Sequence, residues 1–143
     1  MKQVGIEMTE SRKKILVPTS GYFAAKERGD YIIEVAKRFN AEVLVVHVRD
    51  PKFLVATNKE SEGWAALKYF EERGKEAGVP VQSFFTSGEL VEVLKRFAVE
   101  HKADLVLVGA SANRLIAEWV TFDLMSDLDT PILVIPQDMS DLI

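Results

Sequence analysis

The 143-residue sequence contains no cysteine and only two histidines, His47 and His101. The absence of cysteine excludes disulfide bonds, thiol nucleophiles and cysteine-ligated metal sites. The two histidines stand far apart in the chain and lack the spacing of metal ligands. We therefore expect both to be structural residues, one at the end of a strand and one at the end of a helix, and we expect no metal site.

The sequence also lacks an excess of positive charge, since 18 lysines and arginines are outnumbered by 22 aspartates and glutamates, for a formal net charge of −4. Proteins that bind nucleic acid or anionic membranes usually carry a basic surface. No apolar run reaches the ~20 residues of a transmembrane helix, and the charged start of the chain lacks the apolar core of a signal peptide. The composition predicts a cytoplasmic protein that has neither nucleic acid nor membrane as a partner.

Five short apolar runs alternate with four amphipathic segments. Continuous apolar runs are typical of strands buried on both faces, and apolar residues at a period of 3.6 indicate helices. The predicted strands are 14–17, 43–48, 81–85, 105–109 and 130–135, and the predicted helices are 25–39, 64–77, 90–98 and 113–128. This alternation predicts one α/β domain, a three-layer sandwich built around a parallel sheet by right-handed crossovers.

The sequence marks the ends of two predicted helices, whereas the chain ends and one internal segment show no clear pattern. Asn40 and Gly78 are predicted to end helices with a left-handed backbone. Residues 1–12 and 137–143 are expected to be flexible tails. The segment 52–61 is compatible with a loop or with a short helical turn, and the sequence does not choose between them.

The turn from Gly109 to Asn113 is the strongest candidate for a ligand site. It follows a buried strand and precedes a helix, and in open parallel sheets ligands bind at such turns because the next helix presents unpaired N–H groups. The glycine patterns of a P-loop and of a dinucleotide-binding fold are both missing after the first strand. A phospho-acceptor domain would need acidic residues where Ser20 and Thr86 stand. No Ser-His-Asp, paired-carboxylate or metal constellation is present, and we predict no enzymatic activity.

Several segments, taken in order, resemble the universal stress protein family. They are K-K-I-L-V-P-T-S-G-Y, A-K-R-F-N-A-E-V-L-V-V-H-V-R-D-P, S-G-E, A-D-L-V-L-V-G-A-S and T-P-I-L-V-I-P, which begin at residues 13, 36, 87, 103 and 130. The resemblance implies an adenine nucleotide alpha hydrolase-like fold with a five-stranded parallel sheet in the order 3-2-1-4-5 and four helices. It also implies a homodimer formed through the last strand, with Ile132, Leu133, Val134 and Ile135 at the interface.

Family members that bind ATP resemble one another in two features. An aspartate follows the proline that ends the first strand, and the pattern G-x-x-G, nine residues, G-[ST] follows the fourth. The resemblance places these candidate nucleotide-binding residues in this sequence: Pro18, Thr19, Ser20, Gly21, Val48, Val108, Gly109, Ala112, Arg114, Phe122 and Asp123.

Four of these positions depart from the pattern of the ATP binders. Ser20 replaces the aspartate, Ala112 and Phe122 replace the second and third glycines, and Asp123 replaces the Ser/Thr residue. Glycines in a phosphate-binding turn let backbone N–H groups approach oxygen atoms without an intervening Cβ. A phenylalanine ring would fill that space, and a carboxylate would repel phosphate. Arg114 is compatible with an anion contact or with a solvated surface position.

We therefore expect a non-catalytic, dimeric domain of stress-response or regulatory function that acts through an unidentified protein partner. Its loop after the fourth strand departs from the nucleotide-binding pattern of the family, so we expect no cofactor. The alternative is a family member that binds ATP or another adenine nucleotide. A third possibility is an adenylating enzyme of the wider superfamily. The sequence lacks motifs of the type S-G-G-x-D-S or H-I-G-H, in which such enzymes resemble one another.

Overall fold

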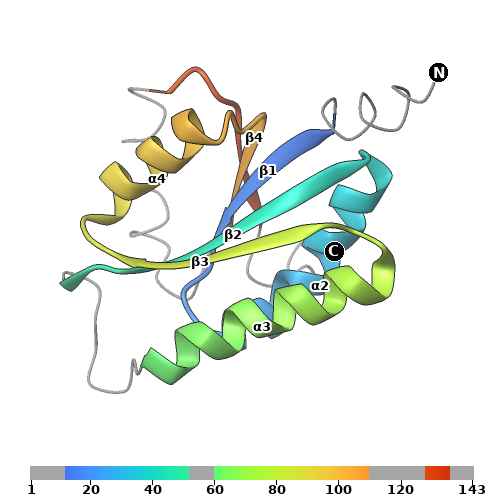
Figure 1. Cartoon of the computed structure of the whole chain (residues 1–143), viewed down its shortest axis with the longest axis horizontal. Helices are drawn as coiled ribbons and strands as arrows, with labels where there is room; N and C mark the ends of the chain where they lie inside the picture. The colour runs from blue at the N-terminus through green and yellow to red at the C-terminus, as the bar shows by residue number, and fades with distance from the viewer. Residues whose placement is uncertain (1–11, 52–59, 110–127, 136–143) are drawn as a thin grey trace, which may run out of the picture.

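The computed structural model describes residues 12–51, 60–109 and 128–135. Their elements along the chain are β1 (Lys13–Pro18), α2 (Tyr22–Arg38), β2 (Ala41–Arg49), α3 (Glu60–Ala77), β3 (Val81–Ser87), α4 (Leu90–Glu100), β4 (Leu105–Gly109) and β5 (Ile132–Ile135) (Figure 1). Three of the four predicted helices correspond to α2, α3 and α4. The fourth, predicted for 113–128, and nearly all of both predicted tails lie outside the described residues.

The five strands form one sheet in the order β3-β2-β1-β4-β5, and every neighbouring pair is parallel. This confirms the α/β class and the order 3-2-1-4-5 that the resemblance implied. The order changes direction between β1 and β4, because β2 and β3 extend from one side of this pair and β5 from the other. A crevice between the carboxyl ends of the two strands is expected at such a switch point.

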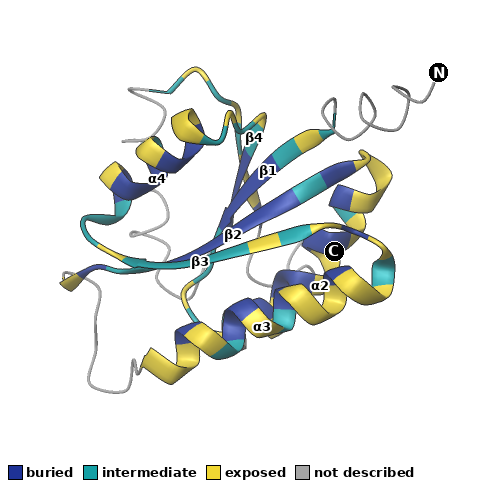
Figure 2. Ribbon diagram, viewed as in Figure 1, coloured by how far each residue is buried: buried dark blue, intermediate teal, exposed yellow. Residues whose placement is uncertain are grey.

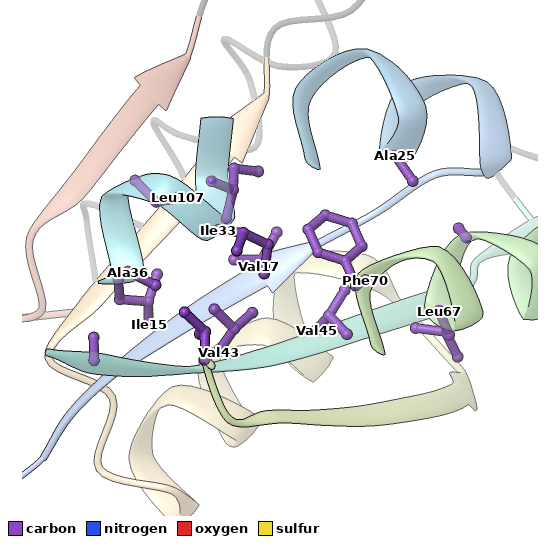
Figure 3. Close-up of a cluster of buried hydrophobic side chains, with 14 of the residues drawn as sticks. Ile15, Val17, Ala25, Ile33, Ala36, Val43, Val45, Leu67, Phe70 and Leu107 are labelled. Carbon is purple, nitrogen blue, oxygen red and sulfur yellow. The ribbon is translucent and has the colours of Figure 1, made fainter. Parts of the chain in front are cut away.

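Helices cover both faces of the sheet, with α2 and α3 on one face and α4 on the other (Figure 1). Alternation along β2 separates the two cores, since Val43 and Val45 belong to the cluster under α2 and α3, and Leu44 and Val46 to the cluster under α4. The cluster on the α2 and α3 side is drawn in Figure 3, where Phe70 of α3 points at the central strands. The interior strands β2, β1 and β4 are mostly buried, whereas the outer faces of the helices are exposed (Figure 2).

Two predicted helix ends are confirmed, and one helix start differs from the prediction. Asn40 and Gly78 have φ of 53° and 76°, the left-handed backbone expected after a helix. Helix α3 begins at Glu60, so Glu60 and Ser61 belong to the helix and not to the segment that the sequence left open. The carboxylates of Glu60 and Glu62 favour this start because they lie at the positive end of the helix dipole.

Helices α2 and α3 pack closely because a glycine faces an aromatic ring. A Cβ added to Gly29 would lie 2.9 Å from the ring of Tyr69, so only glycine admits the ring there without a shift. The Tyr69 hydroxyl donates a hydrogen bond of 3.0 Å to Asp30 of α2. Of the helices in the described ranges, none has the length and apolar character needed to cross a membrane.

Candidate functional site

The turn between β1 and α2 lies at the switch point. β1 ends at Pro18, and the N–H of Thr19 donates to the carbonyl of Val46 at 2.9 Å, which fixes the exit of the strand. Gly21 is the N-cap of α2 and has an extended backbone, and its carbonyl accepts from the N–H of Ala25 at 3.0 Å. Ser20 is exposed. No side chain caps α2 and no acidic residue stands in its first turn, so the positive end of the helix dipole faces this turn.

Val48 lies near the same carboxyl edge of the sheet, on the neighbouring strand β2. Pro18 pairs with Val46, and Val48 therefore lies two residues further toward the carboxyl edge. Its side chain is half-buried and packs against the cluster under α4. Asp50, two residues further along, is buried and accepts a hydrogen bond of 2.7 Å from the N–H of Leu90, at the start of α4. Asp50 therefore ties the end of β2 to the helix that covers this face.

The end of β4 brings Val108 and Gly109 to the other side of the switch point. Val108 is buried under α4. Gly109 pairs with Ile135 of β5, and by strand alternation it faces α2, as Leu107 does. A Cβ added to Gly109 would lie 3.0 Å from Cδ, 3.1 Å from Nε and 3.2 Å from Nη1 of Arg28. The Arg28 side chain thus covers the strand-end glycine.

Sequence reasoning missed Arg28. Its relative exposure is only 7%, and its Nη2 lies 3.6 Å from a carboxylate oxygen of Glu27. Burial lowers the pKa of the Arg28 guanidinium, and the negative charge of Glu27 opposes that shift. The helical period could have indicated that Arg28 is buried, because it stands three residues after Ala25 and four before Ile32, on the apolar face of α2.

His47 lies at the end of β2 on the face opposite Val48. Its relative exposure is 2%, and its Nδ1 lies 2.8 Å from the carbonyl oxygen of Thr19. The other histidine, His101, is the C-cap of α4. Both predictions of position are confirmed. Nδ1 of His47 is engaged with a backbone carbonyl, and the buried ring lacks the access to a substrate that a general base needs.

Several polar side-chain atoms at this edge are buried without a hydrogen-bond partner among the described residues. They include Thr19 Oγ1, His47 Nε2 and Arg49 Nη1. In the same ranges, no group of three histidine, aspartate or glutamate side chains is arranged to hold a metal ion. Among the described residues, the edge therefore offers polar contacts but no nucleophile and base pair.

The structure brings the first part of the predicted site together. Pro18, Thr19, Ser20 and Gly21 lie at the end of β1, Val108 and Gly109 at the end of the adjacent β4, and Val48 on the other neighbour, β2. The predicted residues Ala112, Arg114, Phe122 and Asp123 lie outside the described residues.

The comparison with known proteins agrees with this fold. A universal stress protein of Methanocaldococcus jannaschii is 28% identical over 138 residues, which cover 86% of this chain and 81% of that protein. A crystal structure of a universal stress protein in complex with cAMP has a TM-score of 0.68 at 23% identity, with 89% of this chain and 98% of the other covered. A universal stress protein family protein from Arabidopsis thaliana with AMP bound has a TM-score of 0.66 at 16% identity, with coverage of 90% and 94%.

At these identities the two solved structures establish a shared fold and nothing finer. The sequence comparison goes further, because residues 11–136 match the model of the universal stress protein family, a range that includes every strand of the sheet and both sides of the switch point. The chain therefore belongs to the universal stress protein family.

Proposed function

We propose that this protein is a non-catalytic regulatory domain whose switch-point crevice does not take up ATP. The observation that carries this proposal is the contact between Arg28 and Gly109. A strand-end glycine binds phosphate through close approach of its backbone, which requires that no side chain stands beside it. Here Cδ, Nε and Nη1 of Arg28 take the space on the α2 side of Gly109.

The turn after β1 supports the same proposal. ATP-binding members of the family resemble one another in an aspartate at this turn, and Ser20 takes its place here. A hydroxyl is a weaker hydrogen-bond acceptor than a carboxylate, so this turn lacks the charged acceptor that the ATP binders share. The replacements at residues 112, 122 and 123 argue in the same direction from sequence alone.

Calorimetric titration with ATP and Mg²⁺ tests this proposal. We expect a dissociation constant weaker than about 100 μM, which corresponds to under roughly 5.5 kcal/mol of binding free energy. We also expect that heating the purified protein releases no nucleotide detectable by chromatography. A low-micromolar dissociation constant, or a stoichiometric co-purified nucleotide, would overturn the proposal.

A second candidate function is binding of an adenine nucleotide with a single phosphate. One observation favours it: the N-terminus of α2 has no side-chain cap and no acidic residue in its first turn. The similar structures with cAMP and AMP bound carry one phosphate each. Titration with AMP and cAMP separates the two candidates. If this candidate holds, the dissociation constant of AMP is at least about tenfold lower than that of ATP, or about 1.4 kcal/mol.

We further propose that the protein is a homodimer that pairs through β5. β5 is an edge strand of the sheet, and edge strands present unpaired N–H and C=O groups that invite a further strand. Leu133 and Val134 are 48% and 43% exposed, which is high for apolar residues in a sheet. Pairing about a two-fold axis would cover both residues in each copy.

A further inference from the structure

His47 joins two segments that are distant in sequence. On one side, its Nδ1 holds the carbonyl of Thr19 in the turn between β1 and α2. A carbonyl oxygen only accepts, so Nδ1 carries the proton and Nε2 of the neutral ring carries a lone pair. Nε2 is the buried atom for which the described residues provide no hydrogen-bond partner.

On the other side, the first turns of α3 lie directly on the ring. A Cβ added to Gly63 would stand 2.6 Å from Nε2 and 2.8 Å from Cγ of His47, so neither a side chain nor a water molecule fits between them. Trp64, the next residue, stacks on Phe85 with a centroid distance of 4.4 Å and an interplanar angle of 13°. Phe85 in turn contacts the His47 ring at a centroid distance of 5.2 Å. We call these four residues the His47 cluster.

The surroundings of the ring disfavour its charged form. The charged residues within three positions of His47 or Gly63 are Arg49, Asp50, Glu60 and Glu62, while β3 contributes an aromatic ring and the turn after β1 a carbonyl. Burial lowers the pKa of the imidazole, the bond to the carbonyl opposes this shift, and Arg49 adds to it. The N-terminal end of α3 acts in the same direction as Arg49, because its dipole is positive there.

We propose that His47 is a proton-sensitive positioning residue that couples the start of α3 to the turn between β1 and α2. A proton on Nε2 would need a hydrogen-bond acceptor at the point where Gly63 covers the ring. Protonation therefore releases the first turns of α3, together with the stack of Trp64 on Phe85. The same release frees the ring that holds Thr19, so acid loosens one wall of the switch-point crevice.

The direction of the pH dependence follows from linkage. When α3 is packed on the ring, the pKa of His47 lies below its ordinary value of about 6.5, and it returns toward that value when α3 is released and water reaches the ring. The packed form is therefore most stable above pH 6.5 and loses stability as the pH falls through the window between the two pKa values. One proton is taken up for each release, so the equilibrium shifts by up to about tenfold per pH unit in that window.

Trp64 is a built-in reporter of this change. The chain has two tryptophans, and Trp119→Phe leaves Trp64 as the only one. In this variant, we expect the emission of Trp64 to shift to longer wavelength as the pH falls from 8 to 5, with a midpoint below 6.5. Hydrogen exchange of the amides of residues 60–67, corrected for the intrinsic effect of pH, should accelerate over the same window.

The two histidines provide matched controls. His47→Asn keeps an N–H donor for the carbonyl of Thr19 but does not titrate, so it should abolish the transition. His101→Asn removes the other histidine and should leave the transition unchanged. A signal that is flat from pH 8 to 5, or a transition that persists in His47→Asn or disappears in His101→Asn, would overturn the proposal.

A direct titration keeps the test decisive if His47→Asn does not fold. In His101→Asn, His47 is the only histidine, and the nitrogen and carbon chemical shifts of its ring report both tautomer and pKa. We expect the tautomer with the proton on Nδ1 and a midpoint below 6.5. A midpoint at or above 6.5, or the other tautomer, would contradict the mechanism. Neither experiment uses a nucleotide, so its outcome is independent of the proposed function.

Discussion

The Arg28 side chain occupies the space beside Gly109 that a Cβ would need, so that a residue of α2 covers the carboxyl end of β4. The two residues are 81 positions apart, and no pattern in the sequence indicates that they are in contact. The backbone of Gly109 is not left-handed, since the left-handed glycines of the described residues are Gly78 and Gly88. The glycine is therefore required here for space and not for its backbone conformation.

This contact predicts the effect of Gly109→Ala. The new methyl group would stand 3.0 to 3.2 Å from three atoms of Arg28, which must shift within a packed region. We expect a loss of about 1 kcal/mol in the free energy of unfolding, at the low end for overpacking because the arginine chain is flexible. In an Arg28→Ala background the same substitution should cost less than about 0.5 kcal/mol. Urea unfolding of the four proteins measures this coupling, and equal costs in both backgrounds would refute the contact.

Asp50 is predicted to stabilise the start of α4. Its carboxylate accepts from the N–H of Leu90, while Glu89, the N-cap residue, accepts from the N–H groups of Val91 and Glu92. Loss of a capping acceptor typically costs about 0.5–2 kcal/mol, and burial of Asp50 favours the upper part of this range. Asp50→Ala should lower the free energy of unfolding by about 1–2 kcal/mol in urea. Glu100→Ala, at the exposed end of the same helix, should have almost no effect.

The proposed dimer is tested at β5. Ile135 would be a poor choice for substitution by lysine, because it is only 3% exposed and belongs to the core. Leu133→Lys with Val134→Lys places two charges on the exposed positions and should yield folded monomers by light scattering, with a circular dichroism spectrum like that of the wild type. Val99→Lys, at an apolar residue of α4 that is more exposed than either β5 residue, should leave the dimer intact. A dimer that survives the β5 double substitution would place the interface elsewhere.

The nucleotide loop is tested by rebuilding the family pattern. We expect Ser20→Asp, Ala112→Gly, Phe122→Gly and Asp123→Ser together to create ATP binding that calorimetry detects. Reverting Phe122 alone should abolish the gain. Reverting Asp123 alone should leave binding that strengthens with salt, because screening relieves repulsion between like charges.

The stability of this variant must be measured in parallel. The sequence predicts residue 122 within a helix, where loss of a core ring would cost on the order of 3–5 kcal/mol and glycine would further weaken the helix. A folded variant with all four substitutions that still ignores ATP would show that these side chains do not decide binding. Adding Arg28→Ala to that variant would then test whether the contact with Gly109 is the obstacle.

Sequence alone determined the strands, the sheet order through the family resemblance, and the helix ends at Asn40 and Gly78. These features depend on local composition: an apolar run is buried on both faces wherever it lies, and a left-handed residue ends a helix through contacts within a few positions. The apolar pattern does not mark the start of α3, because Glu60 and Ser61 belong to no apolar period and their helical state depends on packing of the following turns.

Tertiary structure alone decided which polar residues meet at the switch point. Arg28 covers Gly109, His47 holds Thr19, and Gly63 lies on the His47 ring. Each contact joins residues from different elements, at separations of 16 to 81 positions, so no periodicity along the chain records it. Burial of a cation or an imidazole is a property of the whole packed arrangement, because the free energy of the charged form depends on every group that replaces water around it.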